Sequence, residues 1–92
     1  MVVSLEEMKN YLRVDTSEDD NLISTLIHSA ERMCLAIVRK TEEELITESF
    51  HEYKVAVLFA VAYLYEHREE ANHHELTITL RSMLFGVRKA EF

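Results

Sequence analysis

The most constraining feature of the chain is an uninterrupted apolar run from Val55 to Tyr65. Its only polar groups are two tyrosine hydroxyls, and as a helix it would be about 16 Å long. A membrane span requires about 20 such residues, so the run is too short to cross a bilayer. A helix that is apolar on all sides belongs at the centre of a bundle or of an assembly. We therefore expect a central helix over residues 50–70, with Leu58 in the core.

The scarcity of turn-forming residues indicates a helical fold. The chain has one glycine, Gly86, and no proline, whereas average proteins contain about 7% and 5% of these residues. Sheet proteins need more turn residues than this. We expect one all-α domain over residues 1–92, a small bundle of four to five helices around the central apolar helix, with a short C-terminal tail at 86–92.

A repeated capping pattern predicts where the helices begin. A serine or threonine followed three residues later by an acidic residue can form a capping box, and this pattern starts at Ser4, Ser17, Thr41 and Ser49. Together with the spacing of apolar residues, it predicts helices over about 5–13, about 17–40, a short turn within 41–49 and about 50–70. A last helix is expected over about 75–85, with Gly86 just beyond its C-terminus.

The charge distribution argues against a general DNA binder. The formal net charge is −7; residues 1–52 hold 12 acidic and 5 basic residues, and residues 53–92 hold 5 of each. Neutralisation of phosphates supplies most nonspecific affinity for duplex DNA, so an acidic chain binds it poorly. A helix-turn-helix protein is a weaker alternative, because its candidate recognition helix over 75–85 has a single arginine.

No residue pattern predicts catalysis, a metal site or a cofactor. His67, His73 and His74 lie near acidic residues, but their spacing matches no zinc motif. Cys34 lies on the apolar face of its helix, where we expect a buried and inert thiol. As a single cysteine it cannot form an internal disulfide, which fits a reducing compartment. Residues 1–11 lack the features of a signal peptide, so we expect synthesis in the cytoplasm.

A basic and apolar segment ends the otherwise acidic chain. The adjacent cations Arg88 and Lys89 lie there between apolar residues, with Phe85 and Val87 before them and Phe92 after them. Composition alone fits a frayed terminus as well as a docking segment for an acidic or apolar partner surface.

Three blocks of sequence form a pattern in their order and spacing. The first runs from Ser4 to Asp15, continues through Asp19-Asp20, and leads into a helix with Ala30-Glu31. The second is Tyr65-Glu66-His67-Arg68-Glu69, and the third runs from Leu80 to Arg88. The marker residues of the pattern are Leu12, Arg13, Asp15, Asp19, Asp20, Tyr65, Arg68, Glu69 and Arg81. With these blocks the chain resembles the head–tail connector, or adaptor, family of tailed phages and prophages.

The resemblance implies a virion structural protein at the head–tail junction, made in the cytoplasm of the bacterial host. It implies a ring, dodecameric in the virion, between the portal protein and a stopper or tail-completion protein. DNA would contact the ring only while passing through its channel, and no membrane would be involved. The resemblance also implies that Phe85, Val87, Arg88, Lys89 and Phe92 dock onto the portal. The isolated chain can be monomeric, because the ring contacts form fully on assembly.

A different class of function stays open at this point. A small cytoplasmic helical adaptor or regulator that binds a single protein partner has the same composition and the same helix pattern.

One side-chain contact is expected from the pattern. Arg68 directly follows the apolar helix, where an unpaired charge would be costly if partly buried. We expect it to pair with Asp19 or Asp20 near the start of the second helix.

Overall fold

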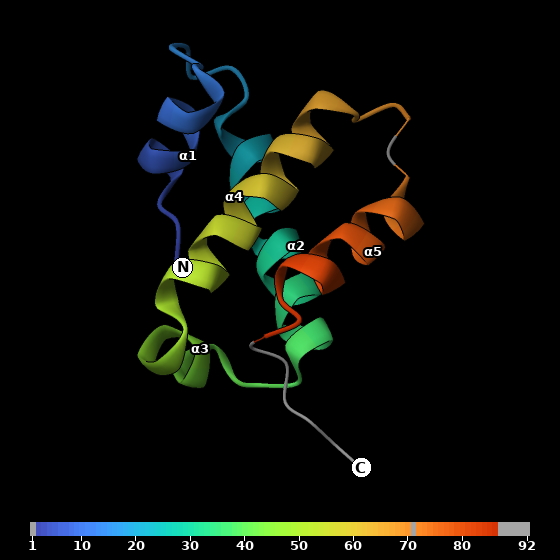
Figure 1. The fold of residues 1–92 in the computed structure, drawn as a ribbon. Helices are drawn as coiled ribbons and strands as arrows, with labels where there is room; N and C mark the ends of the chain where they lie inside the picture. The colour runs from blue at the N-terminus through green and yellow to red at the C-terminus, as the bar shows by residue number, and fades with distance from the viewer. Residues whose placement is uncertain (1, 71, 87–92) are drawn as a thin grey trace.

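The computed structural model describes residues 2–70 and 72–86, and these residues form helices and connecting loops without a β-strand (Figure 1). The helices are α1 (Leu5–Leu12), α2 (Asp20–Val38), α3 (Glu42–Glu48), α4 (Phe50–Glu66) and α5 (His73–Met83). The prediction of an all-α fold with four to five helices around an apolar one is confirmed.

The two longest helices, α2 and α4, form the central pair of the fold. They pack on each other more extensively than any other two helices, and α1 and α5 each contact both of them. In Figure 1, α4 crosses in front of α2, with α5 on one side and with α1 and α3 on the other. Small, fully buried side chains on both helices allow their backbones to approach closely: Ala30 and Cys34 on α2, and Ala56 and Ala60 on α4.

Although α4 is apolar on all sides, it buries only one of them. Its buried residues are Tyr53, Ala56, Val57, Ala60, Val61 and Leu64. On the opposite side Val55 is 40% exposed, and Leu58 and Phe59 are only partly buried. The expectation that Leu58 belongs to the fully buried core is therefore wrong, because α1, α2, α3 and α5 together cover only part of the helix surface.

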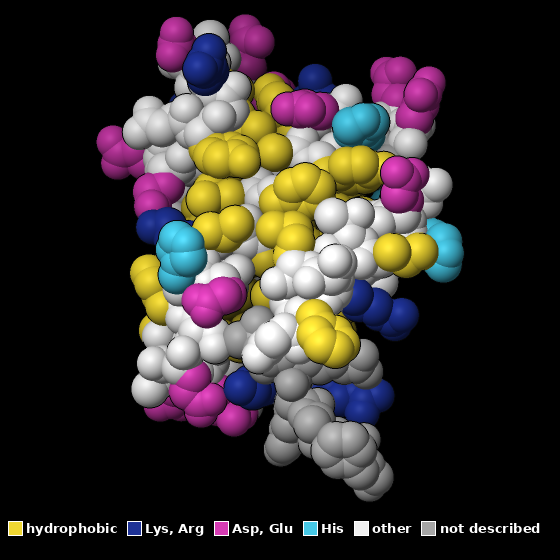
Figure 2. All heavy atoms as spheres, in the orientation of Figure 1, with side chains coloured by type: hydrophobic (Ala, Val, Ile, Leu, Met, Phe, Trp, Pro, Cys, Tyr) yellow, Lys and Arg dark blue, Asp and Glu magenta, His cyan; other side chains and the backbone are white. Residues whose placement is uncertain are grey.

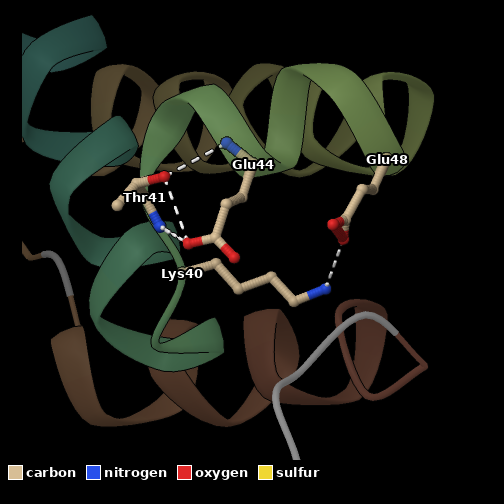
Figure 3. Close-up of polar contacts among 4 residues, drawn as sticks. All are labelled: Lys40, Thr41, Glu44 and Glu48. Atoms are coloured by element: carbon tan, nitrogen blue, oxygen red, sulfur yellow. Dashed lines mark hydrogen bonds and ion pairs between the residues drawn. The ribbon is translucent and has the colours of Figure 1, made fainter.

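Two of the four predicted capping boxes form. The Ser4 hydroxyl accepts the Glu7 backbone N–H at 3.0 Å, and the Glu7 carboxylate accepts the Ser4 N–H at 3.2 Å. Thr41 and Glu44 make the same reciprocal pair, at 3.1 Å in both directions (Figure 3). Each box satisfies two backbone N–H groups that a helix start leaves without a partner.

The other two capping boxes do not form. The cap of α2 is Asp19 rather than Ser17, and it makes no side-chain hydrogen bond to the helix start. Ser49 also makes no side-chain cap. Ser49 is both the C-cap residue of α3 and the N-cap residue of α4, so the junction of the two helices determines its backbone conformation.

Arginines, not glycine, end two helices in the left-handed conformation. Arg13 after α1 has φ 61° and Arg39 after α2 has φ 58°, whereas Gly86 does not have a positive φ. The N–H of Val14 then donates to the Lys9 carbonyl at 2.9 Å, a bond that satisfies one of the last carbonyls of α1. The prediction that Gly86 lies directly after the last helix is wrong, because α5 ends at Met83.

The connection between α4 and α5 differs from the prediction at both ends. Helix α4 ends at Glu66, before the polar and exposed residues 67–70. Helix α5 begins at His73, because the Asn72 side chain accepts the Glu75 N–H at 2.9 Å and caps it there. The central helix is thus shorter than 50–70, and the last helix begins two residues early.

An N-terminal arm that no sequence pattern predicted adds to the core. Val2 and Val3 are buried, and the Val2 N–H donates to the Glu31 carboxylate at 2.8 Å. Glu31 is only 6% exposed and lies on the inner face of α2. A buried carboxylate requires such a partner, so Glu31 fixes the start of the chain against α2.

Burial on α4 gives a direct prediction for stability. Replacing Leu64, which is 6% exposed, with alanine should lower the free energy of unfolding by about 2–5 kcal/mol. Leu58→Ala, the same change on the opposite side of the helix, should cost less, because this side chain is partly exposed in the folded state. Urea unfolding of both variants measures the difference. Equal losses would contradict the asymmetric burial of α4.

Candidate functional site

Asp19 connects the first two sequence blocks at one end of the central pair. Its carboxylate accepts a hydrogen bond of 2.7 Å from the Tyr65 hydroxyl and lies 3.6 Å from an Arg68 guanidinium nitrogen. The Arg68 guanidinium also lies over the Tyr65 ring, 4.7 Å from its centroid. The hydrogen bond to Asp19 raises the pKa of the Tyr65 hydroxyl. The predicted partner of Arg68 is therefore Asp19, one of the two candidates.

Asp20, the other candidate, binds a different cation. Its carboxylate forms an ion pair of 2.8 Å with Lys9 of α1. A second ion pair, between Lys54 of α4 and Glu7 of α1, lowers the pKa of Glu7. The short helix α1 is thus held to both central helices by charged contacts as well as by its apolar face.

The other marker residues of the first block shape the end of α1. Leu12 is partly buried against the core, and Arg13 adopts the left-handed conformation that ends the helix. Asp15 is exposed, in the loop before α2. Within this block the leucine packs and the arginine turns the chain, which accounts for two of the three positions. Glu69, from the second block, is exposed.

The third block lies apart from the contacts among Asp19, Tyr65 and Arg68, which we call the Asp19 cluster. Arg81 is on α5 and lines a shallow hollow together with residues at the C-terminal end of α2. Phe85 follows α5 and is 81% exposed, more than any other large apolar side chain of the described residues. Of the predicted docking residues it is the one that the structure describes; Val87, Arg88, Lys89 and Phe92 lie outside the described residues.

The described part of the chain contains no arrangement suited to catalysis or metal binding. Burial raises the pKa of the Cys34 thiol to about 12, and the nearby Glu31 carboxylate adds to the increase, so the thiolate is not available as a nucleophile. No three histidine, cysteine or acidic side chains among residues 2–70 and 72–86 are grouped to hold a metal ion. Within the same residues, no helix is both long and apolar enough to span a membrane.

Sequence reasoning missed two residues that determine the structure. Glu31 enters the sequence pattern only through the Ala30-Glu31 pair, and Lys54 belongs to none of the three blocks. A glutamate at an inward position of an otherwise apolar stripe was the available signal for Glu31. The partner of Lys54 comes from a helix more than 40 residues earlier, and no local pattern points to it.

Comparison with known proteins assigns the chain to a family. A profile of the phage gp6-like head-tail connector proteins matches residues 2–90, which is nearly the whole chain. The chain therefore belongs to this family of structural, non-enzymatic phage proteins, and it takes part in virion assembly. Searches of curated proteins and of solved structures gave no significant match.

The Asp19 cluster predicts a ranking of two interaction energies. The hydrogen bond of 2.7 Å should give Tyr65→Phe and Asp19→Ala a coupling of about 1 kcal/mol or more. The longer, half-exposed ion pair should give Arg68→Ala and Asp19→Ala a coupling well below about 1 kcal/mol. Double-mutant cycles from urea unfolding measure both. Arg68→Ala with Asp20→Ala is the control, for which we expect no coupling, because Asp20 pairs with Lys9.

Burial of Cys34 predicts that its thiol is unreactive in the folded protein. At pH 8 a thiol-specific reagent such as dithiobisnitrobenzoate should leave Cys34 unmodified in native buffer and should modify it completely in denaturant, because its pKa of about 12 and its full burial suppress the thiolate. The absorbance of the released thiol follows the reaction. Native modification at the rate of the unfolded chain would place Cys34 outside the core.

Proposed function

We propose that the chain is a head–tail connector that forms a ring between the portal and the stopper or tail-completion protein, and that this ring extends the DNA channel. The observation that carries the proposal is the family match over residues 2–90. Residues 1–92 act as a single domain, with 86–92 as its tail. The protein resides at the head–tail junction of the virion, where the ring is dodecameric. The isolated chain can be monomeric, because the ring contacts form fully only on assembly.

The charges of the surface suit a conduit for DNA better than a DNA-binding site. Each of the three lysines in the described residues forms an ion pair with a carboxylate: Lys9 with Asp20, Lys40 with Glu48, and Lys54 with Glu7. The net charge of the chain is −7. Phosphates would therefore meet lysines that already have carboxylate partners and an overall excess of carboxylates, which lets DNA slide through a channel without being held.

The C-terminal segment is the part that we propose docks onto the portal. Phe85 follows α5 and its ring is 81% exposed. The sequence after it contains Arg88, Lys89 and Phe92. An exposed aromatic ring followed by two cations can bind a partner surface that is apolar with an acidic border. The marker residues of α1, α2 and α4, which hold the helices together, have a structural role in this proposal.

Removal of the tail tests the docking proposal. A chain truncated after Phe85 should keep its helix content, because α5 ends at Met83 and the buried Leu84 is retained. It should fail to attach to portal-bearing heads and should leave DNA-filled heads without tails. Circular dichroism checks the fold, and electron microscopy of heads mixed with purified tails counts the joined particles.

A charge-reversed full-length chain separates the role of the cations from that of chain length. Arg88→Glu with Lys89→Glu should reduce joining as the truncation does. Arg32→Glu, a reversal at an exposed arginine of α2, is the matched control and should join normally. If the truncated chain completes heads as well as the full chain does, another surface makes the joint with the portal.

A further inference from the structure

The outer side of α4 carries an apolar stripe that the described residues cover only in part. Leu58 and Phe59 follow Val55 by three and four residues and precede Ala62 by four and three, which places all four on one side of the helix. Figure 2 shows hydrophobic side chains gathered over α4 on the viewer's side. We call these four residues the α4 ridge.

An acidic side chain lies at each end of the α4 ridge. Glu52 precedes Val55 by three residues and Glu66 follows Ala62 by four, so both lie in line with the stripe. Both are exposed. The distance along the helix between Glu52 and Glu66 is about 21 Å. The ridge is thus an apolar strip with a carboxylate at either end.

An apolar groove whose flanking charged residues are arginines runs between α2 and α5. It consists of two shallow hollows of about 250 and 270 Å³ that share Met33. Their apolar lining residues are Leu22, Leu26, Met33, Ala36, Ile37 and Leu64. Arg68 lines the first hollow, and Arg39 and Arg81 line the second. We call this surface the α2–α5 groove.

The α2–α5 groove matches the α4 ridge in length and in charge. Along α2 the groove extends from Leu22 to Ile37, which is about 22 Å of helix. Arg68 lies at one end of the groove beside its partner Asp19, and Arg39 and Arg81 lie at the other end. An apolar strip with acidic ends is complementary to an apolar groove that carries arginines at its ends.

The two surfaces lie on opposite sides of α4. Leu64 lines the groove, and two residues along a helix correspond to about 200° of rotation, so Ala62 points the other way. One copy therefore cannot place its ridge in its own groove. Pairing of two ridges about a two-fold axis would bring Glu52 and Glu66 of both copies together, and this repulsion opposes a symmetric dimer.

We propose that neighbouring copies of this chain join head to tail, with the α4 ridge of one copy seated in the α2–α5 groove of the next. This proposal rests on the ring of the proposed function and names the surfaces that build it. Contacts between two different surfaces give a closed ring when the rotation between copies closes. The shallow hollows make a weak contact in solution, which the portal strengthens by holding the copies side by side.

Engineered cysteines test the contact directly. Ala62→Cys labels the ridge and Ser29→Cys labels the groove, where Ser29 lines the first hollow. Both changes are small, and native Cys34 is fully buried. A short bismaleimide should convert the Ala62→Cys, Ser29→Cys double variant into a ladder of covalent multimers, on portal-bearing heads and at high concentration in solution.

The single variants distinguish a head-to-tail contact from a two-fold one. Each alone should give no product beyond that of the wild type, and an equimolar mixture of the two should give dimers and no larger species. Ala62→Cys with Thr47→Cys, which places the second thiol on an exposed position of α3, is the matched control and should give no ladder. Dimers from Ala62→Cys alone would overturn the proposal in favour of ridge-on-ridge pairing.

The outcomes for this contact and for the connector function are separate. If the wild-type chain attaches to heads but the double variant gives no ladder, the ridge and groove do not form the contact, and the connector function stands. If the wild-type chain does not attach to heads at all, the connector function fails, and crosslinking in solution still decides the contact. Arg81→Glu should weaken the ladder of crosslinked multimers. If adding Glu52→Arg or Glu66→Arg restores the ladder, that glutamate is the partner of Arg81 in the neighbouring copy. If neither restores it, the charge match between ridge and groove is overturned.

Discussion

The fold depends on the close packing of α2 against α4. Fully buried alanines on α4 and the small Ala30 and Cys34 on α2 bring the two backbones together, and larger side chains such as Ile23, Ile27 and Val57 then fill the space beside this contact. Burial of apolar surface of this kind is the main favourable contribution to folding. Helices α1 and α5 pack in the angles between the two long helices, so their positions follow from the central pair.

Polar contacts fix the parts that apolar packing leaves free to shift. Asp19 binds Tyr65 and Arg68, Lys54 binds Glu7 of α1, and Glu31 holds the Val2 backbone. Each joins segments that are distant in sequence, and each has a direction that hydrophobic contact lacks. The two contacts of Asp19 give the aspartate of the first block and the tyrosine and arginine of the second a common structural role.

The same packing leaves the surface that the proposed assembly uses. Among the described residues, the other helices cover one side of α4 and leave the opposite side only partly covered, and a domain of this size buries a modest share of its surface. The uncovered apolar side would be a liability in a protein that acts alone, since exposed apolar patches favour association. In a ring it becomes the contact between neighbours, and a core of limited size gains stability from them.

The sequence by itself determined the features that depend on near neighbours. The helical class follows from the absence of proline and the single glycine, the starts at Ser4 and Thr41 follow from reciprocal bonds over three residues, and the inert state of Cys34 follows from its apolar surroundings. Only the tertiary structure decided which side of α4 is buried, because a helix that is apolar all round has no pattern to tell its sides apart. It also decided that Arg68 binds Asp19 while Asp20 binds Lys9, that Ser17 and Ser49 form no capping box, and that Glu31 holds the N-terminal arm. These outcomes depend on contacts that form only when the helices pack, and the spacing of residues along the chain carries no information about such contacts.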